Sequence, residues 1–212
     1  MNTLLRCRRW SLLAPPTLLA FCAATSAASL TGKELTAALQ RGGYVILMRH
    51  ARSPGTPPDP AQADPDNPHH ERQLDDGGRA AARAMGDALH RLRIPIGQVL
   101  SSAAYRARET ARLANLGPVQ THDQLGDAGH SMTPDASGTR GAWLRGKVAA
   151  APKAGTDTLI ITHAPNIREA FATEGADLAD GEALIFRPDG HGGASFVARV
   201  KIQDWPRLAG AS

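Results

Sequence analysis

The chain has 212 residues, a length typical of one domain or of one domain with a targeting segment. It carries 24 Lys and Arg against 20 Asp and Glu, a formal net charge of +4, and two cysteines. No dense basic run occurs outside the first ten residues, which argues against a nucleic-acid-binding surface. We therefore expect one core and no nucleic-acid partner.

The first 28 residues have the order of a cleavable secretory signal peptide. Three arginines precede an apolar stretch from Trp10 to Ala24, and small residues follow at Ala27 and Ala28. The alternative is a membrane anchor, but a spanning helix needs roughly 20 apolar residues, and this stretch contains two prolines. Residues 29–212 would then form the mature domain, without stable membrane insertion.

Export predicts a periplasmic or secreted protein, by a Sec or Tat route that the segment does not distinguish. Both cysteines, Cys7 and Cys22, lie in the segment, so the mature domain would contain no disulfide. Its three arginines leave 21 basic against 20 acidic residues, a net charge of +1. The positive charge of the chain therefore belongs largely to the part that is removed.

The first core element is the apolar run YVILM at residues 44–48, which predicts a central strand buried on both faces. The segment 53–73 follows with six prolines among Asp, Gly and Gln, and it predicts a long loop over a functional site. Asp75 or Asp76 is a suitable N-cap for a helix that runs to about Leu92.

Strands and helices alternate through the rest of the chain. Strands are predicted at 98–102, 119–121 and 158–163, helices at 104–115, 140–150 and 166–173, and two closing strands at 182–188 and 194–202. This alternation predicts an α/β fold, a three-layer αβα sandwich around a mostly parallel sheet.

Polar residues stand at the ends of three predicted strands, where ligands bind in open α/β sheets. They are Arg49 and His50, Ser101 and Ser102 leading into Arg106, and Thr162 and His163. Converging guanidinium groups select a phosphate or a carboxylate. Fixed positive charge lowers the pKa of a nearby histidine, which keeps its imidazole neutral and nucleophilic.

Three segments carry a resemblance to a known family. "LMRHARSPG", "SSAAYRARETA" and "ITHAPNIREA", in that order, resemble the signature segments of the histidine phosphatase (phosphoglycerate mutase-like) superfamily. "RQLDDGGRAAARAMGDAL" resembles the helix that follows the first signature. Within the family, the chain is most similar to small exported bacterial members, including lipopolysaccharide core heptose phosphate phosphatases.

The resemblance implies a phosphoglycerate mutase-like fold and a metal-independent hydrolysis of a phosphate monoester. His50 would become phosphorylated, Arg49, Arg106 and His163 would hold the phosphoryl oxygens, and water would release phosphate. No cofactor and no metal are implied. The partner would be a small-molecule phosphate ester, a phosphosugar or an envelope-derived compound.

Several nearby residues are less distinct candidates. Arg52 and Ser53 follow the nucleophile closely enough to reach a phosphate, and Arg72 can project from the loop, although each can equally face solvent. His69 and His70 lack a suitably spaced third ligand, so a metal site is not expected there.

The predicted site also needs an acid that protonates the leaving group. Ala164 replaces the aspartate that follows the second histidine in the acid phosphatase branch, so the donor must come from elsewhere. The mutase-like branch takes it from a later segment, which favours Asp127 over Asp123 and Glu182.

Other functions remain alternatives to a phosphatase acting on small molecules. They are a catalytically silent module that binds phosphorylated ligands, a protein phosphohistidine phosphatase, and a mutase, which a short exported chain disfavours. The sequence names neither the physiological substrate nor the oligomeric state.

Overall fold

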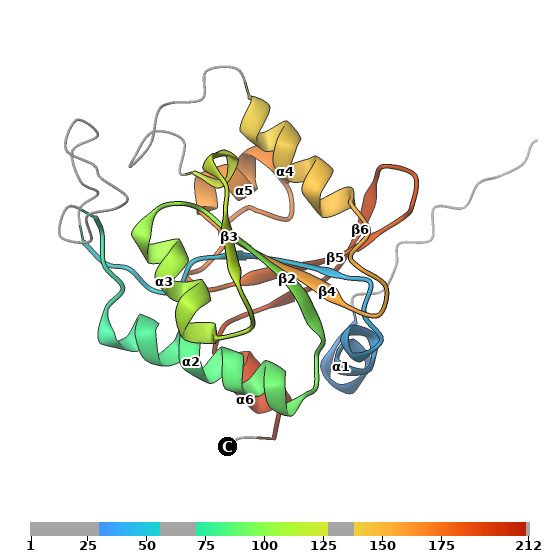
Figure 1. Cartoon of the computed structure of the whole chain (residues 1–212), viewed down its shortest axis with the longest axis horizontal. Helices are drawn as coiled ribbons and strands as arrows, with labels where there is room; N and C mark the ends of the chain where they lie inside the picture. The colour runs from blue at the N-terminus through green and yellow to red at the C-terminus, as the bar shows by residue number, and fades with distance from the viewer. Residues whose placement is uncertain (1–29, 56–70, 127–137, 211–212) are drawn as a thin grey trace, which may run out of the picture.

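A computed structural model describes residues 30–55, 71–126 and 138–210 (Figure 1). The predicted signal peptide lies outside these ranges, and its boundary at residue 28 stays a prediction. Within the described ranges, no helix is long and apolar enough to cross a membrane.

The strands are β1 (Val45–Arg49), β2 (Ile96–Ser101), β3 (Val119–Thr121), β4 (Asp157–Thr162), β5 (Ala183–Pro188) and β6 (Ala194–Val200). The helices are α1 (Gly32–Gln40), α2 (Asp76–Arg91), α3 (Tyr105–Ala114), α4 (Thr139–Ala149), α5 (Ala164–Ala170) and α6 (Asp204–Leu208), with a 3-10 turn, η2, at Asp123–Leu125. The predicted alternation from residue 44 onwards is confirmed.

The six strands form one mixed sheet in the order β3-β2-β4-β1-β5-β6. The first four are parallel, whereas β5 runs antiparallel to β1 and β6 antiparallel to β5. The predicted mostly parallel sheet is confirmed, with an antiparallel edge that strand lengths alone did not indicate. The carboxyl ends of β2, β4 and β1 therefore lie next to one another.

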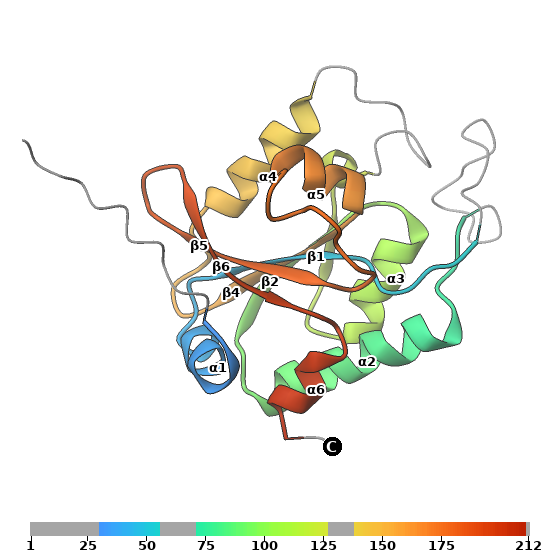
Figure 2. The same cartoon turned by 180° about the vertical axis from the view of Figure 1, so that it is seen from behind.

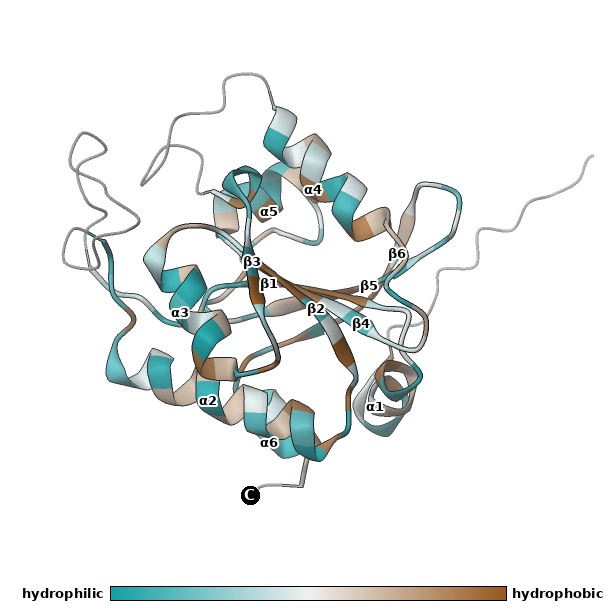
Figure 3. Ribbon diagram, in the orientation of Figure 1, coloured by the Kyte–Doolittle hydropathy of each residue, from teal (hydrophilic) through white to brown (hydrophobic). Residues whose placement is uncertain are grey.

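Helices cover both faces of the sheet. Helices α4 and α5 lie on one face, and α1, α2, α3 and α6 lie on the other (Figures 1 and 2). In Figure 3 brown, apolar residues concentrate in the central strands, whereas the helices alternate brown with teal, as expected for helices that pack one side on an apolar layer. This arrangement is the predicted three-layer αβα sandwich.

The position of β1 between two helix layers explains why its sequence is continuously apolar. Ile46 and Met48 point into the core under α1 and α2, and Val45 and Leu47 point into the core under α4 and α5. All four side chains are essentially inaccessible to solvent. A strand packed on both faces has little freedom to shift, so the residues that follow it are rigidly placed.

Helix α2 is fixed at its start and along its length. The Asp75 carboxylate accepts a hydrogen bond of 2.7 Å from the Gly78 amide, which confirms the predicted N-cap. Farther along, a Cβ atom at Gly86 would lie 1.9 Å from the carbonyl oxygen of Ala114, so only glycine allows α2 and α3 to approach this closely.

Two helices were not predicted. Helix α1 carries a short apolar stripe of Leu35, Ala38 and Leu39, a signal that is present in the sequence but brief. Helix α6 has five residues and is held by Trp205, whose side chain is fully buried. A single buried tryptophan produces no periodicity that a sequence pattern can reveal.

A buried carboxyl group lies at the amino end of β4, opposite the strand ends that carry the histidines. The Asp157 side chain accepts a 2.8 Å hydrogen bond from the Tyr44 amide, while its second oxygen has no partner among the described residues. Burial raises the pKa of this carboxyl to about 7, although the Tyr44 hydrogen bond opposes the shift.

We expect Asp157→Asn to remove a pH-dependent loss of stability. Because the folded-state pKa of Asp157 lies above the unfolded value, the unfolded chain releases this proton first, and stability falls as pH rises from the unfolded-state pKa toward 7. The free energy of unfolding of the variant relative to wild type should increase by roughly 3 kcal/mol between pH 5 and pH 8. Urea titrations at both pH values measure this difference, and parallel pH profiles would contradict it.

Candidate active site

The candidate site lies where three neighbouring parallel strands end. His50 follows β1, Ser102 follows β2 and His163 follows β4, and all three side chains are buried. The backbone continues the sheet to this point, since the His50 amide donates to Thr162 O at 3.0 Å and the Ser102 amide to Ile161 O at 3.0 Å. The predicted convergence of these strand ends is present.

The imidazole of His50 has one defined tautomer. Its Nδ1 lies 2.8 Å from the carbonyl oxygen of Ala51, and because a carbonyl only accepts, Nδ1 must carry the hydrogen. Its Nε2 lies 3.3 Å from Arg106 Nε, which can only donate. The lone pair of His50 is therefore on Nε2 and faces a guanidinium group.

Ala51 itself is fully buried and does not have a positive φ, so alanine is tolerated at this position. Its amide donates to Thr110 Oγ1 at 3.1 Å, and this hydroxyl donates to Arg106 O at 2.7 Å. The loop after β1 is thus attached directly to the helix that carries Arg106.

His163 stands beside His50, with ring centroids 5.2 Å apart in an edge-to-face arrangement. It is the N-cap residue of α5, and its Nε2 lies 2.9 Å from Ser102 Oγ. Its Nδ1 is buried and has no hydrogen-bond partner among the described residues. A buried unpaired polar atom of this kind indicates a place for a ligand.

Both histidines are neutral at ordinary pH. Burial, followed by the positive charge of Arg106, lowers the pKa of His50 to about 3, while the hydrogen bond to Ala51 opposes the shift. Burial and Arg106 also hold the pKa of His163 well below its usual value. The charges of Arg49 and Arg72 act in the same direction on both rings.

Arg49 is oriented by the segment 178–182. Its Nη1 donates to Leu178 O at 2.8 Å, and its Nη2 lies 2.6 Å from the Asp180 carboxylate. Its Nε is buried without a partner among the described residues. Two of its donor groups are therefore used to fix the guanidinium, and the third is available to an anion.

Glu182, the last residue of this segment, stabilises it through a hydrogen bond and an ion pair. Its carboxylate accepts from the Ala179 amide at 2.9 Å and pairs with Arg199, at 2.8 Å to Nε and 3.1 Å to Nη2. The backbone also ties the segment to the site, because the Gly181 amide donates to His50 O at 2.8 Å. These contacts make Glu182 a brace for the residues that hold Arg49.

The residues next to His50 separate into two groups. Ser53 is buried, donates to Gln73 O at 2.7 Å and accepts from Arg72 Nε at 3.1 Å, so it orients Arg72 near the histidines. Arg52 instead pairs with Asp75 at 2.5 Å, and its side chain is 68% exposed. The structure therefore brings Ser53 and Arg72 to the site and turns Arg52 away.

Glu71 is a buried acidic residue that was not among the predicted site residues. Its carboxylate lies 3.7 Å from Arg106 Nη1, and its side chain has no exposed surface. The neighbouring His69 and His70 fall outside the described residues. Among the residues described, no group of three or more histidine, cysteine or acidic side chains is placed to hold a metal ion.

Of the three candidate proton donors, Glu182 is paired with Arg199, as described above. Asp127 lies outside the described residues, and Asp123 is exposed in η2. Asn166 donates to Gln124 O at 3.1 Å and to Thr162 Oγ1 at 3.0 Å. Thr162 at the end of β4 also donates to Leu125 O at 2.7 Å, so α5 and β4 together hold the residues that precede position 127.

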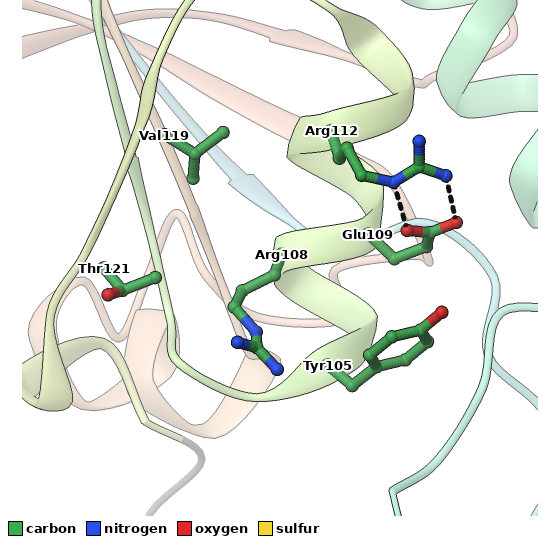
Figure 4. A pocket seen from close by; sticks show the side chains of 6 residues that line it. All are labelled: Tyr105, Arg108, Glu109, Arg112, Val119 and Thr121. Atoms are coloured by element: carbon green, nitrogen blue, oxygen red, sulfur yellow. Dashed lines mark hydrogen bonds and ion pairs between the residues drawn. The ribbon is translucent and has the colours of Figure 1, made fainter. Parts of the chain in front are cut away.

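The opposite side of α3 carries an open groove with an empty volume of about 720 Å³ (Figure 4). Arg112 forms a double hydrogen bond with Glu109 in its wall, at 2.7 and 2.8 Å. The remaining lining residues are Tyr105, Arg108, Val119 and Thr121. The Arg112–Glu109 pair thus belongs to this groove and not to the candidate site.

Comparison with known protein families found a match to part of the chain. The sequence model of the histidine phosphatase superfamily (branch 1) matches residues 45–133. The matched range contains Arg49, His50 and Arg106, and it ends before His163. Among curated proteins, no sequence matches the chain.

Solved structures of phosphatases share the fold. The protein histidine phosphatase SixA, complexed with tungstate, has 19% sequence identity and a TM-score of 0.56 over 76% of this chain and 98% of that chain. A phosphoserine phosphatase variant from Entamoeba histolytica, in complex with phosphoserine, has 12% identity and a TM-score of 0.54 over 76% and 98%. The predicted phosphoglycerate mutase-like fold is confirmed.

The two roles considered for Glu182 predict different kinetics for Glu182→Gln. A brace that orients Arg49 should lower kcat/KM by about 10-fold equally for an alkyl and an aryl phosphate. A proton donor should affect the alkyl ester far more, because its leaving group needs the proton. Asp204→Asn, which removes an exposed pair with Arg207, is the matched control.

Proposed function

We propose that the chain is a histidine phosphatase that hydrolyses a phosphate monoester through a phosphohistidine on His50. The observation that carries the proposal is the neutral His50 imidazole, whose Nε2 lone pair is buried beside Arg106. An amine-like nucleophile held among cations is suited to attack an anionic phosphorus centre.

Binding of the phosphoryl group rests on donors that are already oriented. Arg106, the free Nε of Arg49 and the buried Nδ1 of His163 surround His50 and can each contact a phosphoryl oxygen. Arg72, held by Ser53, adds a further positive charge. Most of the barrier reduction in phosphoryl transfer comes from such positioning and charge stabilisation.

The reaction then follows in two steps. His50 Nε2 forms a bond to phosphorus as the ester oxygen leaves in line, and an acid, which we assign to Asp127, gives the departing alcohol its proton. In the second step water attacks the phosphohistidine and gives a proton to the carboxylate of Asp127, which releases inorganic phosphate and restores both the neutral imidazole and the acid. Asp180 and Glu182 take no part in bond making and keep Arg49 in place.

The compartment and the substrate class extend this proposal. We assign residues 1–28 to a signal peptide and the mature enzyme to the periplasm or the exterior. The substrate would then be a phosphosugar or an envelope-derived phosphate ester. A protein phosphohistidine phosphatase is the second candidate. The protein histidine phosphatase SixA shares the fold over 98% of its length, which supports this alternative.

His50→Ala should abolish turnover. We expect the mature protein to hydrolyse an aryl phosphate with EDTA present, and the variant to lose at least about 1,000-fold in kcat. Rapid quenching with a 32P-labelled substrate should trap acid-labile, base-stable label on the wild type only. Arg112→Ala, in the groove on the other side of α3, is the control. Inactive wild type would favour a silent binding module.

Asp127→Asn tests the assigned proton donor. Loss of a general acid should reduce kcat on an alkyl phosphate by about 100-fold or more and leave an aryl phosphate nearly unchanged. Asp123→Asn is the matched control, because it removes a neighbouring carboxylate from the same segment. Equal losses on both substrates in Asp127→Asn would exclude this role.

A panel of substrates separates the two candidate functions. Sugar phosphates, phosphorylated envelope glycolipids and a phosphohistidine-containing protein should be compared by kcat/KM at one pH. A preference for sugar or glycolipid esters would support the proposed class, and a preference for the phosphorylated protein would support the second.

A further inference from the structure

The hydrogen bonds of Ser102 define which nitrogen of His163 carries a proton. Ser102 Oγ lies 2.9 Å from His163 Nε2 and also accepts the Ala104 amide at 3.2 Å. All three residues are buried: Ser102 follows β2, His163 follows β4, and Ala104 is the N-cap of α3. The tautomer is therefore assigned from these hydrogen-bond partners, since a serine hydroxyl can both donate and accept.

Two arrangements of hydrogens are conceivable, and they are not equivalent. If His163 Nε2 donated, the serine oxygen would accept two hydrogens, and its own hydroxyl hydrogen would have no acceptor among its contacts. If the serine donated to Nε2, its hydroxyl would both donate and accept. The second arrangement leaves fewer buried groups unsatisfied, which favours it by the cost of a lost hydrogen bond.

We propose that Ser102 is a positioning residue that holds His163 in the Nδ1–H tautomer, so that this N–H donates to a phosphoryl oxygen. The inference rests on the proposed phosphatase function for the identity of the acceptor. The tautomer itself follows from the serine contacts. His163 then stabilises the transferred group as a neutral donor and never needs to act as a base.

The unpaired state of Nδ1 agrees with this assignment. A buried N–H without a partner costs free energy in the unliganded protein and regains it when an anion arrives. The other tautomer would place a lone pair against the anion and would weaken binding. His50 uses the opposite nitrogen, since its own Nδ1–H is taken by Ala51 O. The two histidines would thus share one tautomer and perform different tasks.

The test combines a spectroscopic readout with phosphate affinity in the full mature protein. Long-range 1H–15N NMR of histidine-labelled protein should show the Nδ1–H tautomer for His163, assigned by comparison with His163→Gln. Ser102→Ala should increase the Nε2–H form and raise the inhibition constant of inorganic phosphate by about 10-fold. Ser102→Thr, which keeps the hydroxyl, should restore both.

Ser101→Ala is the matched control. Ser101 is equally buried and adjacent, but its hydroxyl donates to Ser102 O at 3.0 Å and does not touch His163. It should leave the tautomer unchanged. An Nε2–H tautomer in wild type, or a Ser102→Ala protein with unaltered tautomer and phosphate affinity, would overturn the inference. Absence of any turnover would instead count against the phosphatase function, because the tautomer is measured without a substrate.

Discussion

The hydrogen bond from His50 Nδ1 to Ala51 O is the contact on which the candidate site depends. It fixes the imidazole plane and leaves the lone pair on Nε2, directed at Arg106. The ring can make this bond only because β1 ends immediately before it and is locked between β4 and β5. Chemistry at one nitrogen thus rests on the packing of the central strand.

Carboxylates balance the positive charges of the candidate site. Glu71 lies near Arg106, Asp180 pairs with Arg49, and Glu182 pairs with Arg199 behind them. Without them, several guanidinium groups at close range would repel one another and splay apart. Paired arginines keep their geometry before an anion arrives, so little reorganisation accompanies binding.

Much of the fold could be predicted from the sequence, because the residue types indicate which positions are buried. The runs 45–49 and 157–162 are apolar since both faces are covered, and Asp75 caps α2 as expected. Helix α6 was not predicted because it depends on one tryptophan, and the antiparallel edge follows from chain topology that local patterns do not encode.

The site was predictable only in part, for a similar reason. Strand ends place His50, Ser102 and His163, and the helix after β2 places Arg106. Spacing along the sequence does not determine where a side chain in a loop points. Arg52 pairs with Asp75, whereas Ser53 is buried and contacts Arg72. Glu71 carried no signal, because a carboxylate next to two histidines in a proline-rich segment resembles ordinary loop composition.

Helix α5 holds both flanks of the segment 127–137. Asn166 binds Gln124 O on one side, and Glu169 accepts the Gly141 amide at 3.3 Å on the other. Both attachment points are therefore contacts with α5, the helix whose N-cap residue is His163. A change that shifts α5 would therefore move both attachment points and the second histidine of the candidate site together.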